Sequence, residues 1–279
     1  MHCASVKIVI ATASIFAAAV QAQGAGPSPA KPEMMESCPG LVAARPPFVP
    51  AAFHLAALER GQARLTYVGH STFLIESPQL VRLATDYNDY VRPTVLPDIA
   101  TMNHAHSTHY TLSPDPGIKY VLRGWSEDQK PARVDVQYKD VRVRSVATNI
   151  RDWGGGGTQR HGNSIFIFEL ANLCIAHLGH LHHTLTQQQL NEIGRVDVVL
   201  VPVDGSYTLD LDGMVEVLHA MKAPLMIPMH YFSAYTLDRF LQRVRREWDV
   251  EVAEIPSLVV SKATLPAKPK VLVLPGRAF

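Results

Sequence analysis

Hydrophobic and polar positions divide the chain into a strand-rich first half and a second half in which strands and helices alternate. We expect strands over the β-rich runs at residues 63–68, 72–76, 80–85, 134–146 and 164–169. Gly69 and Pro78 break the first three runs apart, which predicts consecutive strands of an antiparallel meander.

The second half predicts buried strands with helices between them. Apolar runs mark strands at residues 171–176, 196–203, 225–229 and 271–274, and a near-continuous run indicates burial on both faces. Thr186, with Gln189 three residues later, predicts a helix that stops at Gly194. Two further helices are predicted by the apolar stripes Leu211, Met214, Val215, Leu218 and Leu237, Phe240, Leu241, Val244, the second capped by Thr236. This order of elements predicts an α/β (α+β) protein with helices outside its sheets.

Eight of the thirteen histidines fall in three short patches. The patches hold His104, His106 and His109; His177, His180, His182 and His183; and His230. Neutral imidazole is the commonest protein ligand for zinc and similar metals. His180 follows one predicted strand and His230 ends another, and functional residues gather past the carboxyl ends of such strands. The patches therefore predict one metal centre at a single sheet edge.

Six motifs, in order along residues 63–233, resemble those of the metallo-β-lactamase superfamily in its ascorbate-6-phosphate-lactonase-like branch. They are residues 69–76, Thr85-Asp86, residues 104–109, residues 162–166 with 175–179, residues 201–205 and residues 227–231. The resemblance implies a four-layer αββα sandwich with the site at one edge. It also implies that His104, His106, His109 and His230 bind metal, with His180 in a further ligand position.

The motifs also depart from the family pattern. The family's aspartate between its histidines is Thr108 here, and its bridging aspartate is His180. The family's middle histidine should fall near residues 146–152, where Asn149 and Asp152 are the only donors. An imidazole-rich site leaves the metal more positive and disfavours two close divalent ions. We expect one ion, zinc first, with Mn, Fe or Cu as alternatives.

The expected function is an exported metal-dependent hydrolase of a small-molecule substrate. A metal-bound water or hydroxide would attack a lactone, ester or phosphodiester bond. The alternatives are a catalytically degenerate metal- or ligand-binding member of the fold and a redox metal protein. We expect catalytic roles for Asp86, which would hold a ligand imidazole, and for His183, as general acid or base. A turn-capping aspartate and an exposed loop imidazole are the alternative interpretations.

The N-terminal residues, the net charge and the cysteines indicate the cellular location and the classes of partner. Residues 1–22 are typical of a secretory signal peptide, residues 23–60 of a Pro/Ala-rich lead, and residues 61–279 form the metallo-β-lactamase-like domain. Cleavage predicts a periplasmic or secreted protein without a membrane span. A net charge of +1 without a basic stripe argues against nucleic-acid binding. We expect Cys174 to be a buried free thiol without a disulfide; the oligomeric state is not predicted.

Overall fold

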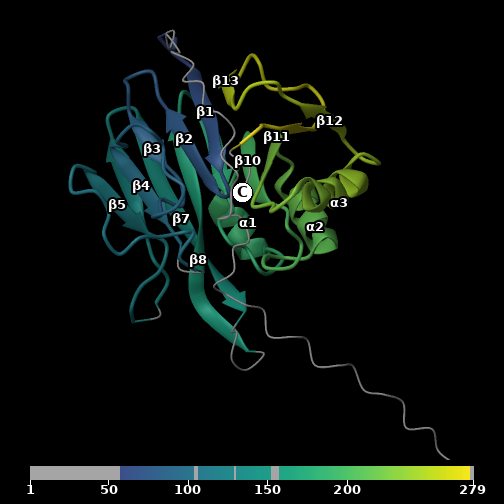
Figure 1. The fold of residues 1–279 in the computed structure, drawn as a ribbon, viewed down its shortest axis with the longest axis horizontal. Coiled ribbons are helices and arrows are strands. Elements are labelled where there is room, and N and C mark those ends of the chain that lie inside the picture. The colour runs from purple at the N-terminus through teal and green to yellow at the C-terminus, as the bar shows by residue number, and fades with distance from the viewer. Residues whose placement is uncertain (1–56, 104–105, 129, 152–156, 277–279) are drawn as a thin grey trace, which may run out of the picture. The chain divides into compact units, whose positions relative to one another are not determined.

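The computed structural model describes residues 57–103, 106–128, 130–151 and 157–276 (Figure 1). The predicted signal peptide, nearly all of the predicted lead, and His104 lie outside these ranges, so their predictions stay predictions. None of the helices described is long and apolar enough to cross a membrane.

Two sheets form the centre of the fold. The six-stranded sheet has the order β13-β1-β2-β3-β4-β5. Its strands are β1 (Gln62–Gly69), β2 (Thr72–Glu76), β3 (Arg82–Ala84), β4 (Ile99–Met102), β5 (Tyr120–Arg123) and β13 (Ser257–Ser261). The predicted meander is confirmed, because β1 pairs antiparallel with β2 and β2 with β3.

The second sheet has eight strands in the order β12-β14-β11-β10-β9-β8-β7-β6. They are β6 (Asp135–Tyr138), β7 (Val141–Arg151), β8 (Thr158–Leu170), β9 (Leu173–His177), β10 (Val198–Pro202), β11 (Leu225–Met229), β12 (Asp249–Val252) and β14 (Lys270–Val273). Strands β6 to β9 pair antiparallel, whereas β9, β10 and β11 run parallel. The carboxyl ends of β9, β10 and β11 therefore meet at one edge.

Three helices cover the outer face of the eight-stranded sheet: α1 (Gln187–Ile193), α2 (Leu211–Met221) and α3 (Ala234–Val244) (Figure 1). Thr186 and Gln189 form the predicted capping box of α1. The predicted cap of α3 is wrong by three residues: Ser233 is the N-cap, and Thr236 is the N3 residue that bonds back to it. Both positions carry a hydroxyl, and the helix begins at the earlier one.

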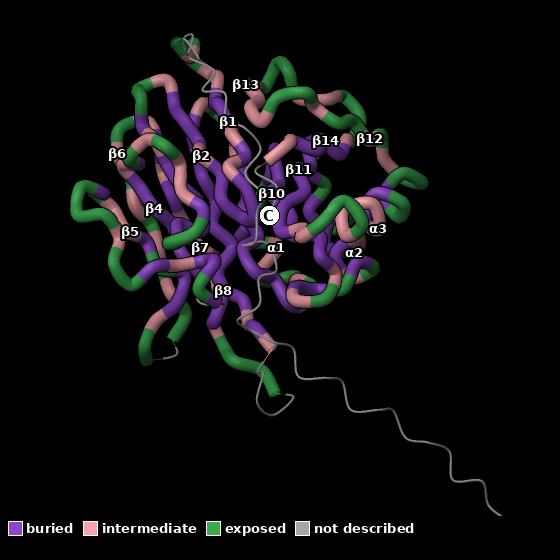
Figure 2. Tube along the Cα trace, in the orientation of Figure 1, coloured by how far each residue is buried: buried purple, intermediate pink, exposed green. Residues whose placement is uncertain are grey.

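Apolar side chains fill three clusters. One lies between the sheets, where Phe73, Phe166 and Phe168 are fully buried. A second packs α2 and α3 on the eight-stranded sheet. On the outer face of the six-stranded sheet, the residues that cover β3 and β4 come from loops, including Tyr87, Ile118 and Trp125. Figure 2 shows buried residues along the strands and exposed residues at the turns. The predicted two-sheet sandwich is thus confirmed, with loops forming the outer layer on one side of the described chain.

Candidate metal centre

Four histidines converge at one edge of the sandwich: His106, His109, His180 and His230. One ring nitrogen from each lies within 4.8 Å of the others. His109, His180 and His230 are fully buried, whereas His106 is 8% exposed and brings the cluster to the surface. These four residues, the His cluster, are the one group in the described ranges whose His, Cys, Asp and Glu side chains are placed to hold a metal ion.

Two residues of the His cluster lie just past the carboxyl ends of the parallel strands. His180 lies three residues past the end of β9, and His230 directly follows β11. His230 adopts φ 55°, and its backbone N–H donates to the carbonyl of His70, which directly follows β1. The cluster therefore lies where the ends of the two sheets meet, as the sequence predicted for His180 and His230.

Two buried asparagines hold the loops that carry the cluster. The Asn103 backbone N–H donates to the His109 carbonyl, and its side-chain oxygen accepts from the Ser164 N–H at 2.9 Å. The Asn163 side-chain oxygen accepts from the His180 N–H at 2.8 Å. Gly179 sits between these two amides at φ 59°, and a Cβ there would lie 2.5 Å from each. A larger residue at position 179 would push His180 out of place.

Buried carboxylates orient His109 and His230. Asp86 Oδ2 lies 2.5 Å from His109 Nδ1, and Asp204 Oδ1 lies 3.0 Å from His230 Nδ1. A carboxylate accepts hydrogen bonds, so each imidazole carries its proton on Nδ1 and presents an unprotonated Nε2. These two Nε2 atoms are 3.2 Å apart. Two lone pairs at that distance need a cation between them.

Neutral side chains hold the other two imidazoles. The Thr108 hydroxyl lies 2.7 Å from His106 Nδ1 and 2.9 Å from His70 Nε2. His180 Nδ1 lies 2.5 Å from His182 Nε2, and His182 Nδ1 accepts from the Arg151 backbone N–H at 2.8 Å. Across the centre, His180 Nε2 and His106 Nε2 are 2.9 Å apart.

The electrostatics favour a bound cation. Burial, reinforced by neighbouring imidazoles, lowers the pKa of His106 to about 2 and holds those of His109 and His180 well below their usual value. These three imidazoles are therefore neutral near pH 7, so none of them brings an extra proton to the centre. Burial raises the pKa of Asp86, whereas hydrogen bonds and His230 lower that of Asp204 despite its burial. A divalent ion would offset these two buried carboxylates.

The donor set fits a metal such as zinc. Four nitrogens at about 2.05 Å around a tetrahedral ion lie about 3.3 Å apart. The Nε2 atoms of His109 and His230 are 3.2 Å apart, so these two rings need little movement to bind one ion. Carboxylate partners on the remote nitrogen of a ligand histidine are a common feature of metal sites.

The structure places the other predicted residues as follows. His104 lies outside the described residues. Asp86 contacts His109 through its other ring nitrogen, as predicted. His183 does not join the His cluster: its ring is 6.4 Å from that of His182, and its predicted catalytic role stays a prediction. Cys174, predicted to be buried, is a free thiol of intermediate exposure.

Three contributors to the site were missed or assigned differently from the sequence. Asp204 was not expected to hold His230, although its position after a buried strand was the signal for a site residue. Thr108 was expected only as a lost aspartate, yet it bridges His106 and His70. His182 was named in the second histidine patch, but its role was not predicted, because its partner Arg151 lies at the distant end of β7.

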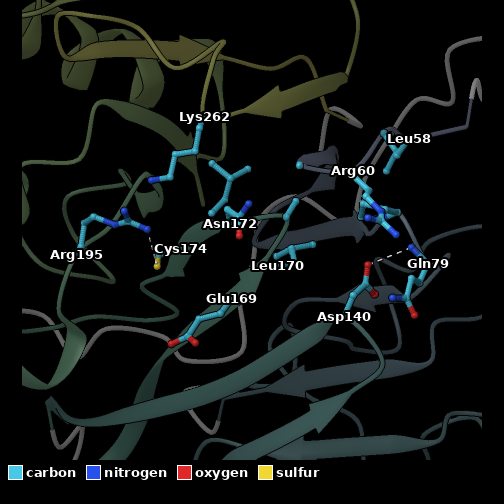
Figure 3. A pocket seen from close by; sticks show the side chains of 14 residues that line it. Leu58, Arg60, Gln79, Asp140, Glu169, Leu170, Asn172, Cys174, Arg195 and Lys262 are labelled. Carbon is cyan, nitrogen blue, oxygen red and sulfur yellow. Dashed lines mark hydrogen bonds between the residues drawn. The ribbon is translucent and has the colours of Figure 1, made fainter.

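A groove of about 970 Å³ lies at the opposite edge of the sheet from the His cluster. Figure 3 shows Arg195 reaching the Cys174 sulfur at the start of β9, with Lys262 on another side and Asp140 further along. Strand β9 runs from this groove to His177 beside the cluster. Size alone therefore does not identify the functional edge; the histidines do.

Comparison with known proteins agrees with this geometry. A family profile described as a β-lactamase superfamily domain matches residues 64–230. The chain is 25% identical over 189 residues to the UPF0173 metal-dependent hydrolase of Thermoplasma acidophilum, covering 60% of this chain and 83% of the relative. The corresponding protein of Archaeoglobus fulgidus is 26% identical over 191 residues, covering 60% and 83%.

A solved structure gives the same result. A proposed Zn-dependent hydrolase of the metallo-β-lactamase superfamily from Thermotoga maritima superposes with a TM-score of 0.58 at 26% identity, covering 76% of this chain and 98% of that one. The two sequence relatives are named metal-dependent hydrolases, and the solved structure shares the fold of this chain. This chain belongs to the metallo-β-lactamase superfamily.

Proposed function

We propose that this protein is an exported metal-dependent hydrolase that cleaves a lactone, ester or phosphodiester bond in a small molecule. One observation carries the proposal. His109 and His230 direct unprotonated nitrogens at each other across 3.2 Å, each backed by a buried carboxylate. That arrangement is stable only around a cation, and two relatives of this chain are named metal-dependent hydrolases.

A divalent ion at this position would polarise the scissile bond and lower the pKa of water. His106, His109 and His230 would hold it, with His180 as the fourth imidazole of the cluster. Asp86 and Asp204 keep two of the rings in one tautomer and orientation. The neutral, imidazole-rich donor set favours one ion, zinc first, with Mn, Fe or Cu as alternatives.

The burial of the cluster sets where a substrate can approach. Only His106 among the four is exposed to solvent, so a substrate would reach the centre from its side. Asp204 also accepts from the backbone N–H groups of Ser206, Tyr207 and Thr208, which fixes the loop after β10 beside His230. Figure 1 places β10 and β11, which lead to Asp204 and His230, side by side in the eight-stranded sheet.

The test is hydrolysis by the zinc-loaded protein of chromogenic lactone, carboxylic ester and phosphodiester substrates. We expect the wild type to hydrolyse at least one class of substrate. His230→Gln should show no turnover. Chelation should abolish turnover by the wild type, and added metal should restore it. A wild-type protein that holds metal but turns over none of the three classes would contradict the proposal and favour a degenerate binding protein. Equal turnover by wild type and His230→Gln would also contradict it.

The export part of the proposal rests on residues 1–22, which have the pattern of a signal peptide. We expect expression of the full chain in a Gram-negative host to give a periplasmic product that lacks these residues. N-terminal sequencing of each cell fraction checks this, and an uncleaved cytoplasmic product would contradict it.

A further inference from the structure

We propose that His180 faces the metal centre with an N–H group rather than a lone pair. It would then act as a hydrogen-bond donor to an anionic oxygen of the substrate, while His106, His109 and His230 alone bind the ion. The inference rests on the proposed metal-dependent function and gives His180 a role that differs from that of the other three imidazoles. It follows from the directions of three consecutive hydrogen bonds.

The first bond fixes the tautomer of His182. Its Nδ1 lies 2.8 Å from the Arg151 backbone nitrogen, and a backbone N–H can only donate. His182 Nδ1 is therefore an unprotonated acceptor. An imidazole whose Nδ1 is an unprotonated acceptor carries its proton on Nε2, so His182 donates from that side of the ring.

The position of Arg151 is itself secured, so the first bond is not incidental. Arg151 ends β7, where its backbone pairs with Thr158 of β8. Its Nη2 donates to the carbonyls of Ser206, Tyr207 and Thr208. These contacts tie the end of β7 to the loop that also holds Asp204.

The second bond transmits this choice to His180. His182 Nε2 lies 2.5 Å from His180 Nδ1, and because His182 carries its proton there, His180 Nδ1 must accept it. A neutral His180 then carries its own proton on Nε2. This is the opposite tautomer to His109 and His230, whose Nδ1 atoms donate to carboxylates.

The third bond shows where the His180 N–H points. His180 Nε2 lies 2.9 Å from His106 Nε2, inside the His cluster. His106 accepts there, and its own Nδ1–H then donates to the Thr108 hydroxyl at 2.7 Å. In the metal-free protein the His180 N–H therefore donates to the His106 lone pair, and an ion bound by His106 would take that lone pair and leave the His180 N–H to donate to an anion. An N–H cannot bind a metal ion, but it suits a carboxylate or phosphate oxygen, or one that gains charge during hydrolysis.

The replacement of an aspartate by histidine at position 180 also indicates a change from cation binding to anion binding. The family pattern that this chain resembles has an aspartate where His180 stands. A carboxylate there binds cations, whereas the His180 N–H binds anions. His182 is a positioning residue: it fixes the tautomer of His180 and does not itself belong to the His cluster.

The direct test is nuclear magnetic resonance of the full protein labelled with ¹⁵N-histidine, with and without zinc. Long-range proton–nitrogen correlations distinguish the two tautomers of each ring. We expect the His180 proton on Nε2 in both states and the protons of His109 and His230 on Nδ1. His182→Glu, which places an acceptor next to His180 Nδ1, should move the His180 proton to Nδ1, whereas His183→Gln should leave it on Nε2. A His180 proton on Nδ1 in the wild type overturns the inference.

Zinc affinity gives a second measurement that does not depend on the folding of His182→Glu. Competition with a chromogenic chelator should show that His180→Gln binds zinc within about 3-fold of wild type, whereas His230→Gln loses about 100-fold or more. Inorganic phosphate, as the anionic probe, should bind the zinc-loaded wild type at least about 10-fold more tightly than zinc-loaded His180→Gln. Equal loss of zinc affinity in both variants, or equal phosphate affinity, overturns the inference.

The two proposals fail in different ways. A wild type that binds no zinc would refute the proposed function, yet the tautomer of His180 would still be decided in the metal-free protein. A wild type that binds zinc and hydrolyses a substrate, but in which His180→Gln loses its zinc, would refute only the inference.

Discussion

The two halves of the His cluster are built on different partners, although one ring nitrogen of each imidazole lies within 4.8 Å of the others. His109 and His230 are each held by a buried carboxylate. His106 and His180 are held by neutral groups, the Thr108 hydroxyl and the His182 ring. The first pair is prepared to donate electron density to a cation. The second pair has lost the two family carboxylates at positions 108 and 180.

The difference shows how a chain can change a metal site without moving it. Asp86 and Asp204 stay outside the ligand set and still supply two negative charges, one imidazole away from the ion. Thr108 and His180 replace charge by hydrogen bonds within the same backbone frame. We therefore propose that the centre holds one ion, because it lacks the anionic ligands that a second ion would need.

The largest effect should follow removal of charge from the carboxylate half. Asp86→Asn and Asp204→Asn each keep an acceptor oxygen but lose the negative charge, so we expect zinc affinity to fall by about 10- to 100-fold for each and further in the double variant. Chelator competition measures this. Asp135→Asn, on the exposed strand β6, is the matched control and should bind zinc as the wild type does. Unchanged affinity in the double variant would remove the distinction between the halves.

Acid should destabilise the metal-free site. Burial lowers the pKa of His106 to about 2 and that of His182 to about 3, whereas both are near 6.5 in the unfolded chain. Below pH 6.5 the unfolded state therefore binds protons that the folded state does not, and stability is lost as the pH falls. At pH 5.5 each ring costs about 1.4 kcal/mol relative to pH 7.5.

Urea denaturation of the metal-free protein at these two pH values checks this. We expect the free energy of unfolding to fall between pH 7.5 and 5.5, and to fall less in His182→Gln, which lacks one titrating ring. The same pH dependence in both proteins would contradict the assignment of His182 as a buried neutral group.

A smaller effect should follow loss of the Thr108 hydroxyl. Thr108→Val keeps the shape but removes the bridge between His106 and His70, so we expect a loss of about 1 kcal/mol in unfolding free energy and a modest loss of zinc affinity. Thr101→Val on β4 is the matched control: the Thr101 hydroxyl is also buried, but makes no hydrogen bond within the chain that the structure describes. An equal effect of both substitutions would show that the bridge contributes nothing specific.

Local patterns in the sequence predicted much of this architecture. The apolar runs before His180 and His230 predicted two strands, and the parallel-strand rule placed both residues at one edge, as the structure has them. The capping box at Thr186 was also a local signal. By contrast, β4, β5, β12 and β13 were not predicted, because three have only four residues and their pairing partners lie elsewhere in the chain.

The partners of the site residues were harder to predict, because they depend on long-range pairing. Asp204 reaches His230 across 26 residues, and His182 meets Arg151 across 31. The sequence indicated that Asp204, His230 and His182 lie in segments that carry site residues. It did not show which nitrogen of each ring would face the centre. That choice depends on the hydrogen-bond partner on the far side of the ring.

The most direct test of the account is the metal content of the protein purified without added metal or chelator. Elemental analysis should be run on the wild type beside His106→Ala, with His219→Ala on α2 as the control outside the cluster. The account predicts about one ion per chain in wild type and His219→Ala, and a large loss in His106→Ala. No metal in wild type even after reconstitution, or equal metal in all three proteins, would contradict a metal centre at the His cluster.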